Sequence, residues 1–526
     1  MAPNKIVSKL EQLEDIIVLI PFKHTLDGLS VEEIEKIVYE FTKKGFQIEP
    51  DAFRKLIEVF TEYREINKNE IIKEIIKRKS SELTHSTFVT TKDIEEILPK
   101  KEELEGKIEY EDIKADVEVI RDPGNEIKIL EGIEGFKNYF LNRYTKLLKI
   151  VNSRPSQKSF TKIDKISNNG KDVKIAGLVK EKKVVKDKVI LEVEDPTGVL
   201  KIVSKQDNQN RTPLEVLPDQ LVIVEISSIK EGLAYASRIE FPEIPDTGFQ
   251  TKAPEVYALL LSDLHIGSKS FQKETFEHLL HWLQGYHGDK EIIRKLKYII
   301  IAGDLVDGVG IYPNQEKELE ETDIRKQYIL VAQYIEQIPK HIQVIIIPGN
   351  HDATRQALPQ PSIPKKYCEE LYRMDNVKMY GDPLEIKLHG INFLVYHGRS
   401  LDDVFAYSPS SETSRPENAM RLLLRARHLA PVFGARTIIA PAEEDSLVID
   451  TPPDVFHAGH VHIFGYTKYR NTLIINSGTF QNQTMHQKSI GINPTPGIGA
   501  IVNLNTLEVI EKDFNKITIQ HNLQRI

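Results

Sequence analysis

Seven polar side chains follow apolar runs in the second half of the 526-residue chain, and all seven are of types that bind divalent metal ions. They are Asp263, His265, Asp304, Asn350, His397, His460 and His462. This mixed set of oxygen and nitrogen donors, without a thiolate, suits manganese, magnesium, iron or zinc. Seven ligands are too many for one ion. Two ions that share a carboxylate would use them all, in the arrangement that catalyses phosphoryl transfer.

Taken singly, each of these motifs has a structural interpretation. A lone Asp-x-His or Gly-Asp-x-x-Asp is weak evidence. Among the motif residues Asp307 and Asp352 have the strongest structural alternative to a ligand role, because an aspartate after a turn usually caps a helix. Five such motifs in order, each at the end of an apolar run, favour one common site. The neighbouring glycines permit tight turns and close backbone approach: Gly267, Gly303, Gly349, Gly398 and Gly459.

The elements that must position these residues are predicted from the pattern beyond residue 254. The apolar runs at 256–261, 298–301 and 344–347 are continuous, which is typical of strands buried on both faces. Amphipathic segments at 276–283 and 328–338 are expected to be the helices between them. Because ligands bind just outside the carboxyl ends of strands in an α/β sheet, the polar residues are expected to converge.

The preceding residues divide into four predicted parts: a helical N-terminal module over 1–78, a charged linker over 79–125, a helical segment over 126–155 and an OB-fold β-barrel over 156–247. The N-terminal module is either a docking element or a plain helical domain. Five short apolar runs separated by turn signals predict the barrel. Its strands offer only Tyr235 and Phe241 for stacking on bases, so a packing role is favoured over DNA binding. The helical segment is predicted to bury one face made of Phe136, Phe140, Tyr144, Leu147 and Val151.

The composition excludes several classes of protein. The 70 Lys and Arg and the 78 Asp and Glu give a net charge of -8, so a polyanion must be held by local patches or metal ions. The single cysteine, Cys368, excludes an intrachain disulfide and is not expected to be a nucleophile. There is no signal peptide and no apolar run of ~18 residues, so a soluble intracellular protein without membrane contact is expected.

The five motifs together resemble a known family. Asp-x-His, Gly-Asp-x-x-Asp, Gly-Asn-His-Asp, a later His-Gly and Gly-His-x-His are those of the calcineurin-like metallophosphoesterases. Their domain, a β-sandwich flanked by helices, would span 253–526. The stretches PGNHDATRQALPQP, YHGRSLDDV and GHVHIFGYTKYRNTLIINSGTFQNQT are similar to the small subunits of the archaeal family D DNA polymerase. The order of helical module, OB-fold and phosphoesterase domain also fits that multidomain α+β architecture.

The resemblance implies a metal-dependent 3′-to-5′ exonuclease that proofreads for a polymerase. One ion would be bound by Asp263, His265, Asp304 and His462, and the other by Asp304, Asn350, His397 and His460, with manganese the expected metal. His351 would be catalytic, as the acid that protonates the leaving oxygen. Arg355 and Arg399 are candidate substrate ligands, although a solvated or ion-paired arginine is an equal alternative. The implied partners are a large catalytic subunit, single-stranded or mismatched 3′ ends of DNA, and a sliding clamp reached through the nucleoid-associated replication complex.

Two other interpretations stay open. The same dimetal core could belong to a phosphatase or a cyclic-nucleotide phosphodiesterase, which would need neither the OB-fold nor the helical module. Alternatively, the chain is a scaffold subunit without activity, as the eukaryotic relatives are after losing metal ligands. Because this chain keeps every ligand position, the exonuclease is favoured.

Overall fold

The computed structural model describes residues 31–62, 68–81, 88–95, 113–130, 132–154, 159–167, 171–205, 212–246, 248, 253–286, 288–409, 411–489 and 491–516. Residues 1–30 of the predicted N-terminal module, and 517–526 of the predicted phosphoesterase domain, lie outside this part. The chain forms two compact units: Met1–Glu109 with Gln284–Lys290 and Ile517–Ile526, and Tyr110–Leu283 with Glu291–Lys516.

The first unit is mainly helical. It contains α2 (Val31–Thr42), α3 (Pro50–Glu62), α4 (Lys68–Ser81) and α5 (Thr91–Glu95), with β1 (Gln47–Ile48) parallel to β2 (Phe88–Val89). In α3 the apolar residues recur at helical spacing, and Phe53, Leu56, Ile57 and Phe60 are all buried in one core. Val89 and Ile94 are buried in that core as well, inside the stretch predicted to be a charged linker. Few apolar residues surround them in the sequence, so no periodic pattern indicates this burial.

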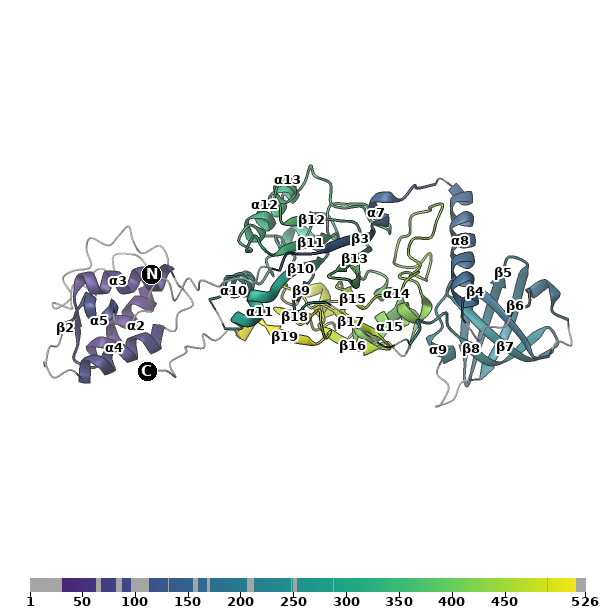
Figure 1. Ribbon diagram of the computed structural model, residues 1–526, viewed down its shortest axis with the longest axis horizontal. Helices are drawn as coiled ribbons and strands as arrows, with labels where there is room; N and C mark the ends of the chain where they lie inside the picture. The colour runs from purple at the N-terminus through teal and green to yellow at the C-terminus, as the bar shows by residue number, and fades with distance from the viewer. Residues whose placement is uncertain are drawn as a thin grey trace. The chain divides into compact units, whose positions relative to one another are not determined.

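The second unit contains a closed barrel. Its strands are β4 (Val173–Val185), β5 (Lys188–Asp195), β6 (Gly198–Lys205), β7 (Leu221–Lys230) and β8 (Leu233–Glu240), paired in the order β4-β5-β6-β8-β7 (Figure 1). Along β5 the side chains alternate, with Val189, Leu191 and Val193 buried. The five predicted strands of the barrel are therefore confirmed.

Helix α8 (Gly132–Asn152) precedes the barrel and buries a stripe that only partly overlaps the predicted one, because Leu147 and Val151 are buried as predicted. Tyr139, Arg143, Leu147 and Val151 are buried at helical spacing, whereas the predicted Phe136, Phe140 and Tyr144 are not fully buried. The prediction counted apolar residues alone and could not place an arginine at the centre of a buried face. Nε of Arg143 donates to Oδ2 of Asp445 at 2.7 Å, and Nη1 donates to the carbonyl of Pro431 at 2.6 Å.

Asp445→Ala is expected to destabilise the second unit by ~3–5 kcal/mol, because it leaves the fully buried Arg143 guanidinium without its carboxylate. The adjacent Glu444 offers a matched control. Glu444 forms an ion pair with Lys146, which lies on α8 like Arg143, but the Glu444 side chain is 69% exposed. Glu444→Ala is therefore expected to lower the free energy of unfolding by at most ~1 kcal/mol. Urea unfolding followed by fluorescence of Trp282, the single tryptophan, measures both variants. Equal shifts of the two midpoints would contradict the prediction.

Two sheets make up the rest of the second unit (Figure 1). One has the order β12-β11-β10-β9-β18-β19 and the other β16-β17-β15-β14-β13-β3. The first comprises β9 (Tyr257–Leu261), β10 (Leu296–Ala302), β11 (Gln343–Ile347), β12 (Val377–Met379), β18 (Ile498–Asn503) and β19 (Val509–Asp513). The second comprises β3 (Val117–Arg121), β13 (Leu384–Leu388), β14 (Ile391–Tyr396), β15 (Val455–Ala458), β16 (Gly465–Tyr469) and β17 (Thr472–Asn476).

The two sheets share one core, which contains Leu260, Ile300 and Ile345 of the first and Phe393 and Ile475 of the second. The predicted strands at 256–261, 298–301 and 344–347 are confirmed as β9, β10 and β11, and they run parallel to one another. The predicted helices are α10 (Lys273–Leu283) and α12 (Ile324–Ile335). Helix α15 (Pro416–Ala426) packs on the second sheet through a separate core.

Strand β3 lies within residues predicted to be a charged linker. It pairs antiparallel with β13, and the Arg121 side chain bonds to Glu385. The two strands are separated by more than 260 residues, so no local pattern could indicate their pairing. The second sheet therefore extends into the predicted linker.

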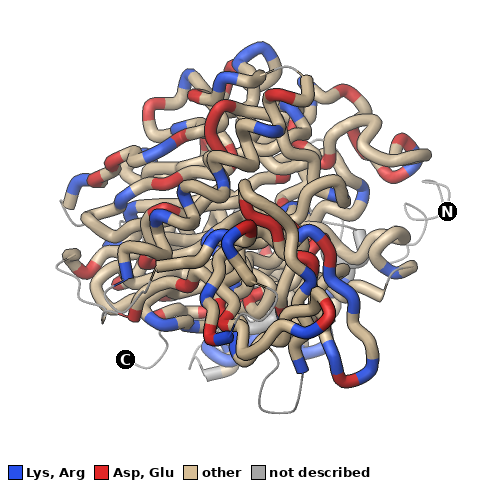
Figure 2. Tube along the Cα trace, turned by 90° about the vertical axis from the view of Figure 1, so that its right-hand side faces the viewer, with Lys and Arg blue, Asp and Glu red and all other residues tan. Residues whose placement is uncertain are grey.

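Acidic and basic residues are nearly equal in number in this chain, 78 against 70. Figure 2 shows acidic and basic residues interspersed along the described trace. Among the described helices, none is both long and apolar enough to cross a membrane.

Candidate metal centre

The predicted ligands stand where strands of both sheets end. Asp263 and His265 follow β9, Asp304 follows β10 and Asn350 follows β11, while from the second sheet His397 follows β14 and His460 and His462 follow β15. The loops are tied to one another through the backbone. Asp263 donates its N–H to the Gly303 carbonyl at 2.9 Å, and His265 to the Asp304 carbonyl at 3.1 Å.

Backbone strain is concentrated in these loops. Five of the seven predicted ligands have φ between 50° and 70°, a region that costs residues other than glycine ~1–2 kcal/mol each: Asp263, His265, Asp304, His460 and His462. Such strain persists only where the surroundings impose it, and it is typical of functional sites. Glycine is required beside them, because a Cβ on Gly349 or Gly459 would collide with the carboxylate of Asp304 or Asp263.

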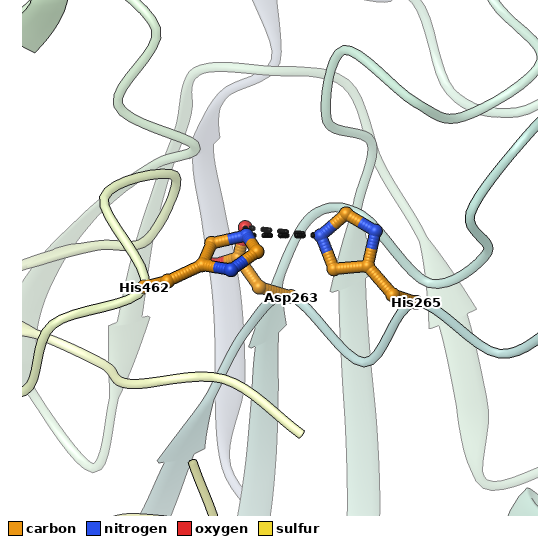
Figure 3. Close-up of side chains that lie close together, drawn as sticks. All are labelled: Asp263, His265 and His462. Carbon is orange, nitrogen blue, oxygen red and sulfur yellow. Dashed lines mark hydrogen bonds and ion pairs between the residues drawn. The ribbon is translucent and has the colours of Figure 1, made fainter. Parts of the chain in front are cut away.

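Asp263, His265 and His462 form the first cluster of ligand atoms (Figure 3). The Nε2 atoms of the two histidines are 3.0 Å apart. Oδ1 of Asp263 is 3.3 Å from Nε2 of His462 and 3.9 Å from Nε2 of His265. Oδ1 of Asp263 is buried and has no hydrogen-bond partner among the described residues. A buried carboxylate oxygen without a donor is costly, and a divalent cation would satisfy it. These three side chains fit a metal ion.

Asp304 joins this cluster to a second one. Its Oδ2 lies 3.7 Å from Nε2 of His265 and 3.4 Å from Nε2 of His397, which in turn is 3.0 Å from Oδ1 of Asn350. Asp263, Asp304 and His397 also offer ligand atoms within 4.8 Å of one another. The Asp304 carboxylate therefore stands between two sets of ligands, as a bridging group must.

The buried carboxylates make the centre attractive to cations. Burial would lower the pKa of His397, but Asp304 and Asp263 outweigh it and raise that pKa to about 10. Burial would likewise raise the pKa of Asp304, yet His397 and His351 hold it well below its ordinary value. A field that stabilises a proton on a buried imidazole also stabilises a divalent ion in its place.

Three histidines of the centre have a partner outside it. Nδ1 of His265 is 3.1 Å from Oδ1 of Asp307, Nδ1 of His397 is 2.8 Å from the Ala302 carbonyl, and Nδ1 of His462 is 2.7 Å from the side-chain amide of Gln487. The partners of His265 and His397 are acceptors, so they hold a proton on Nδ1, fix the ring and leave Nε2 for a ligand role. Gln487 presents an amide nitrogen, which is a donor, so this contact orients the His462 ring without placing a proton on its Nδ1.

His460 differs from the other histidines of the centre. Its Nε2 is 3.4 Å from Oδ2 of Asp402, and its ring lies beside that of His397. It belongs to none of the ligand clusters found among the described residues. The structure therefore places His460 at the centre without bringing its Nε2 to the other ligand atoms.

The structural alternative for Asp307 and Asp352, that they cap helices, is wrong. Asp307 bonds to His265 and accepts from the side-chain amide of Gln481 at 2.8 Å. Asp352 accepts the N–H of Gly349 at 2.8 Å and the hydroxyl of Tyr328 at 2.9 Å. The chain after each aspartate continues as a loop, so no helix begins there to be capped. Asp307, Gln487 and Asp402 were missed as partners, since each contact joins segments that are distant in the sequence.

Asp307→Ala is expected to weaken metal binding by ~10–100-fold, because His265 loses the acceptor that orients its ring. Asp307→Asn keeps an oxygen that can accept from Nδ1 and is expected to have a smaller effect. Titration of the full chain with Mn²⁺, followed by the paramagnetic signal of the free ion, measures both affinities. An unchanged affinity in Asp307→Ala would refute an orienting role.

The structure also places the predicted catalytic and substrate-binding residues. Nδ1 of His351 lies 2.7 Å from the Asp307 carbonyl, and its ring is 4.7 Å from that of His265. The Arg355 guanidinium bonds to backbone carbonyls of its own loop, including that of Ala357 at 3.3 Å. Arg399 donates to the side chain of Gln356 at 2.8 Å. Both arginines are thus held by the loop that follows Asn350.

The centre lies in a segment that matches a class of polymerase subunits. The family model for the B subunits of DNA polymerases alpha and epsilon matches residues 258–465, which contain all seven predicted ligands. The DNA polymerase II small subunit of Pyrococcus furiosus is 39% identical over 422 residues, 76% of this chain and 69% of the relative. That of Methanothermobacter thermautotrophicus is 34% identical over 490 residues, 91% of this chain and 100% of the relative.

The chain therefore belongs to the family of DNA polymerase II small subunits, the small subunits of the archaeal family D DNA polymerase. Among solved structures, an archaeal phosphodiesterase aligns with 49% of this chain and 99% of its own, at 13% identity and a TM-score of 0.26. This similarity is too low to define the fold or the activity.

Proposed function

We propose that the chain is a proofreading 3′-to-5′ exonuclease and accessory subunit of a replicative DNA polymerase. The observation that carries the proposal is the Asp304 carboxylate between two sets of buried ligand atoms, 3.7 Å from Nε2 of His265 and 3.4 Å from Nε2 of His397. A shared carboxylate is typical of two-metal phosphoryl transfer. Membership of the polymerase small-subunit family supports DNA as the substrate.

Each part of the chain has a place in this proposal. The two packed sheets and their helices form a calcineurin-like phosphoesterase domain, which consists of residues 253–526 with the addition of strand β3, and the closed barrel is an OB-fold over 156–247. The helical segment over 126–155 keeps its predicted bounds, whereas the N-terminal module, predicted over 1–78, extends to include Val89 and Ile94, which share its core. Within the barrel Phe241 is 4% exposed and Tyr235 is 38% exposed. So few accessible rings support a packing role for the barrel over stacking on bases.

Two divalent ions would be the cofactors, with manganese expected and magnesium, iron or zinc as alternatives. Asp263, His265 and His462 would hold one ion, and Asn350, His397 and His460 the other, with Asp304 shared between them. When bound, the pair would lower the pKa of a water nucleophile and offset charge on the phosphate oxygens. His460 would have to present Nδ1, because its Nε2 already faces Asp402.

His351 would supply the proton to the leaving 3′-oxygen. The Asp307 carbonyl next to its Nδ1 can only accept, so Nδ1 carries a proton and Nε2 faces the substrate. The proton given from Nε2 is therefore the second proton of the imidazolium form, and the ring returns to the neutral form with Nδ1 protonated. The backbone N–H of His351 donates to Oδ1 of Asp304 at 2.8 Å, which fixes the residue beside the centre. Arg355 and Arg399 would contact phosphates of the strand with the N–H groups that their loop leaves unused.

The partners in this proposal are a large catalytic polymerase subunit, the 3′ end of DNA and, through the complex, a sliding clamp. The net charge of -8 gives no long-range attraction to DNA. The metal centre and the large subunit must therefore hold the strand.

A substrate panel separates this proposal from its competitors. The full chain with Mn²⁺ is offered linear single-stranded DNA labelled at its 5′ end, the same strand closed into a circle, p-nitrophenyl phosphate and a cyclic nucleotide. The exonuclease is expected to shorten only the linear strand, from its 3′ end. Hydrolysis of the small esters with intact DNA would indicate a phosphatase or cyclic-nucleotide phosphodiesterase. No reaction, alone or with the large subunit, would indicate a scaffold.

A further inference from the structure

A polar cavity of about 820 Å³ lies away from the metal centre, since none of the predicted metal ligands lines it. It is walled by the end of α8, the exit of β8, the end of α15 and the turn between β16 and β17. Five guanidiniums line it, those of Arg154, Arg238, Arg425, Arg427 and Arg470. Its size is within the range of pockets that bind small molecules.

Three of these arginines are neutralised by carboxylates. Arg425 pairs with Glu215 and, at 3.2 Å, with Glu243, which also lies 3.7 Å from Arg470. Arg238 pairs with Glu240 at 2.8 Å. The remaining lining carboxylate, that of Asp450, pairs with Arg121 at 3.5 Å. The three carboxylates that line the cavity, those of Glu240, Glu243 and Asp450, therefore each have an ion pair with another arginine. None of them has an ion pair with Arg154 or Arg427.

Arg154 and Arg427 bond only to backbone carbonyls among the described residues. Nη2 of Arg154 donates to the Phe241 carbonyl at 3.0 Å, and Nε of Arg427 donates to the Ile449 carbonyl at 2.7 Å. Arg427 is only 3% exposed.

Burial lowers the pKa of Arg427 to about 10, with a further contribution from Arg154, although Asp450 acts in the opposite direction. Burial also lowers the pKa of Arg154, against the effect of Glu240 and Glu243. Arg427 is buried and Arg154 is half-buried, and neither guanidinium has an ion pair with a carboxylate among the described residues, so an anion that joined them would offset the cost of burying the Arg427 charge.

We propose that this cavity binds a small molecule through its phosphate group, with Arg154 and Arg427 as the principal ligands. The planar guanidinium fork matches phosphate oxygens in pairs, and a phosphate dianion carries the charge that two cations require. The phosphate can come from free pyrophosphate or from a nucleotide, which share this chemistry. Because the cavity joins the barrel exit to the second sheet, an occupant would also tie these two parts together.

Calorimetric titration of the full chain in EDTA tests the proposal, since removal of metal keeps the metal centre from binding phosphate. Pyrophosphate and dATP are the two phosphate probes, and citrate is the carboxylate control. Arg154→Gln is expected to raise the Kd of the bound phosphate probe by ~10-fold or more, because it removes charge-assisted hydrogen bonds. Arg470→Gln is expected to raise this Kd less. Arg470 also lines the cavity, but its guanidinium already lies 3.7 Å from the carboxylate of Glu243.

Arg373→Gln provides the matched control, because this arginine is 67% exposed and pairs with Glu369 outside the cavity. Its Kd is expected to equal that of the wild type. Trp282 fluorescence verifies that each variant is folded. A tighter response to pyrophosphate than to dATP would identify free phosphate, and the reverse a nucleotide. The proposal is overturned if neither probe binds, or if citrate binds as tightly as the phosphate probes. It is also overturned if Arg154→Gln and Arg470→Gln both bind the probe with the wild-type Kd.

Discussion

Asp304→Asn is expected to remove the bound metal ions and lower DNA cleavage by ~10²–10³-fold or more. Asparagine keeps the shape of the side chain and an oxygen that can accept the N–H of His351, now bonded at 2.8 Å. It removes the negative charge that lies 3.7 Å from Nε2 of His265 and 3.4 Å from Nε2 of His397. Both halves of the centre lose the same carboxylate, so neither ion is expected to remain.

Metal content after dialysis against Mn²⁺ measures this effect directly. Asp323→Asn is the matched control, since Asp323 caps α12 at an exposed position and asparagine caps equally well. The control is expected to retain both ions of the pair, and Asp304→Asn to retain neither. Full metal content in Asp304→Asn would show that the carboxylate is not shared.

His351→Ala is expected to lower cleavage by ~10²–10⁴-fold while both metal ions are retained. The reason is the hydrogen bond from Nδ1 to the Asp307 carbonyl, which leaves Nε2 for proton transfer. The same residue also lies in a group of potential ligands with His265 and Asp304. The two possible roles of His351 predict different results for His351→Ala. If His351 is a metal ligand, the variant loses metal together with cleavage, whereas if it is the proton donor, the variant loses cleavage alone.

Single-turnover cleavage and metal content, measured on the same sample, separate these roles. His486→Ala is the control, since His486 lies on α16 (Met485–Ser489), a short helix without buried residues, and is no member of the ligand clusters among the described residues. It is expected to cleave at the wild-type rate. If His351→Ala loses an ion, the residue is a ligand, and the assignment of the acid is wrong.

Much of the fold can be predicted because buried strands have a distinctive pattern. The continuous apolar runs of β9, β10 and β11 have no polar alternation, and the parallel sheet brings their carboxyl ends to one edge. That rule alone predicts that Asp263, Asp304 and Asn350 lie close together. The barrel is recognisable for a related reason, since alternation along strands such as β5 has a period of two.

Other features depend on contacts that no local pattern records. Asp307 meets Gln481 across 174 residues, and Arg143 meets Asp445 across 302. An arginine on a helix is ordinarily assigned to the solvent face, so the buried stripe of α8 was predicted correctly at Leu147 and Val151 but not at Arg143. The left-handed backbone of the ligand loops was equally hard to predict, because aspartate and histidine are enriched in this conformation but adopt it at only a small share of their positions.

Anomalous diffraction from crystals of the full chain soaked in Mn²⁺ tests the two-metal centre most directly. We predict two peaks that share Asp304, one bounded by Asp263, His265 and His462 and the other by Asn350 and His397. Rotation of His460 to present Nδ1 to the second peak would complete that ligand set. A single peak, or none among these side chains, would contradict a two-metal mechanism for this chain.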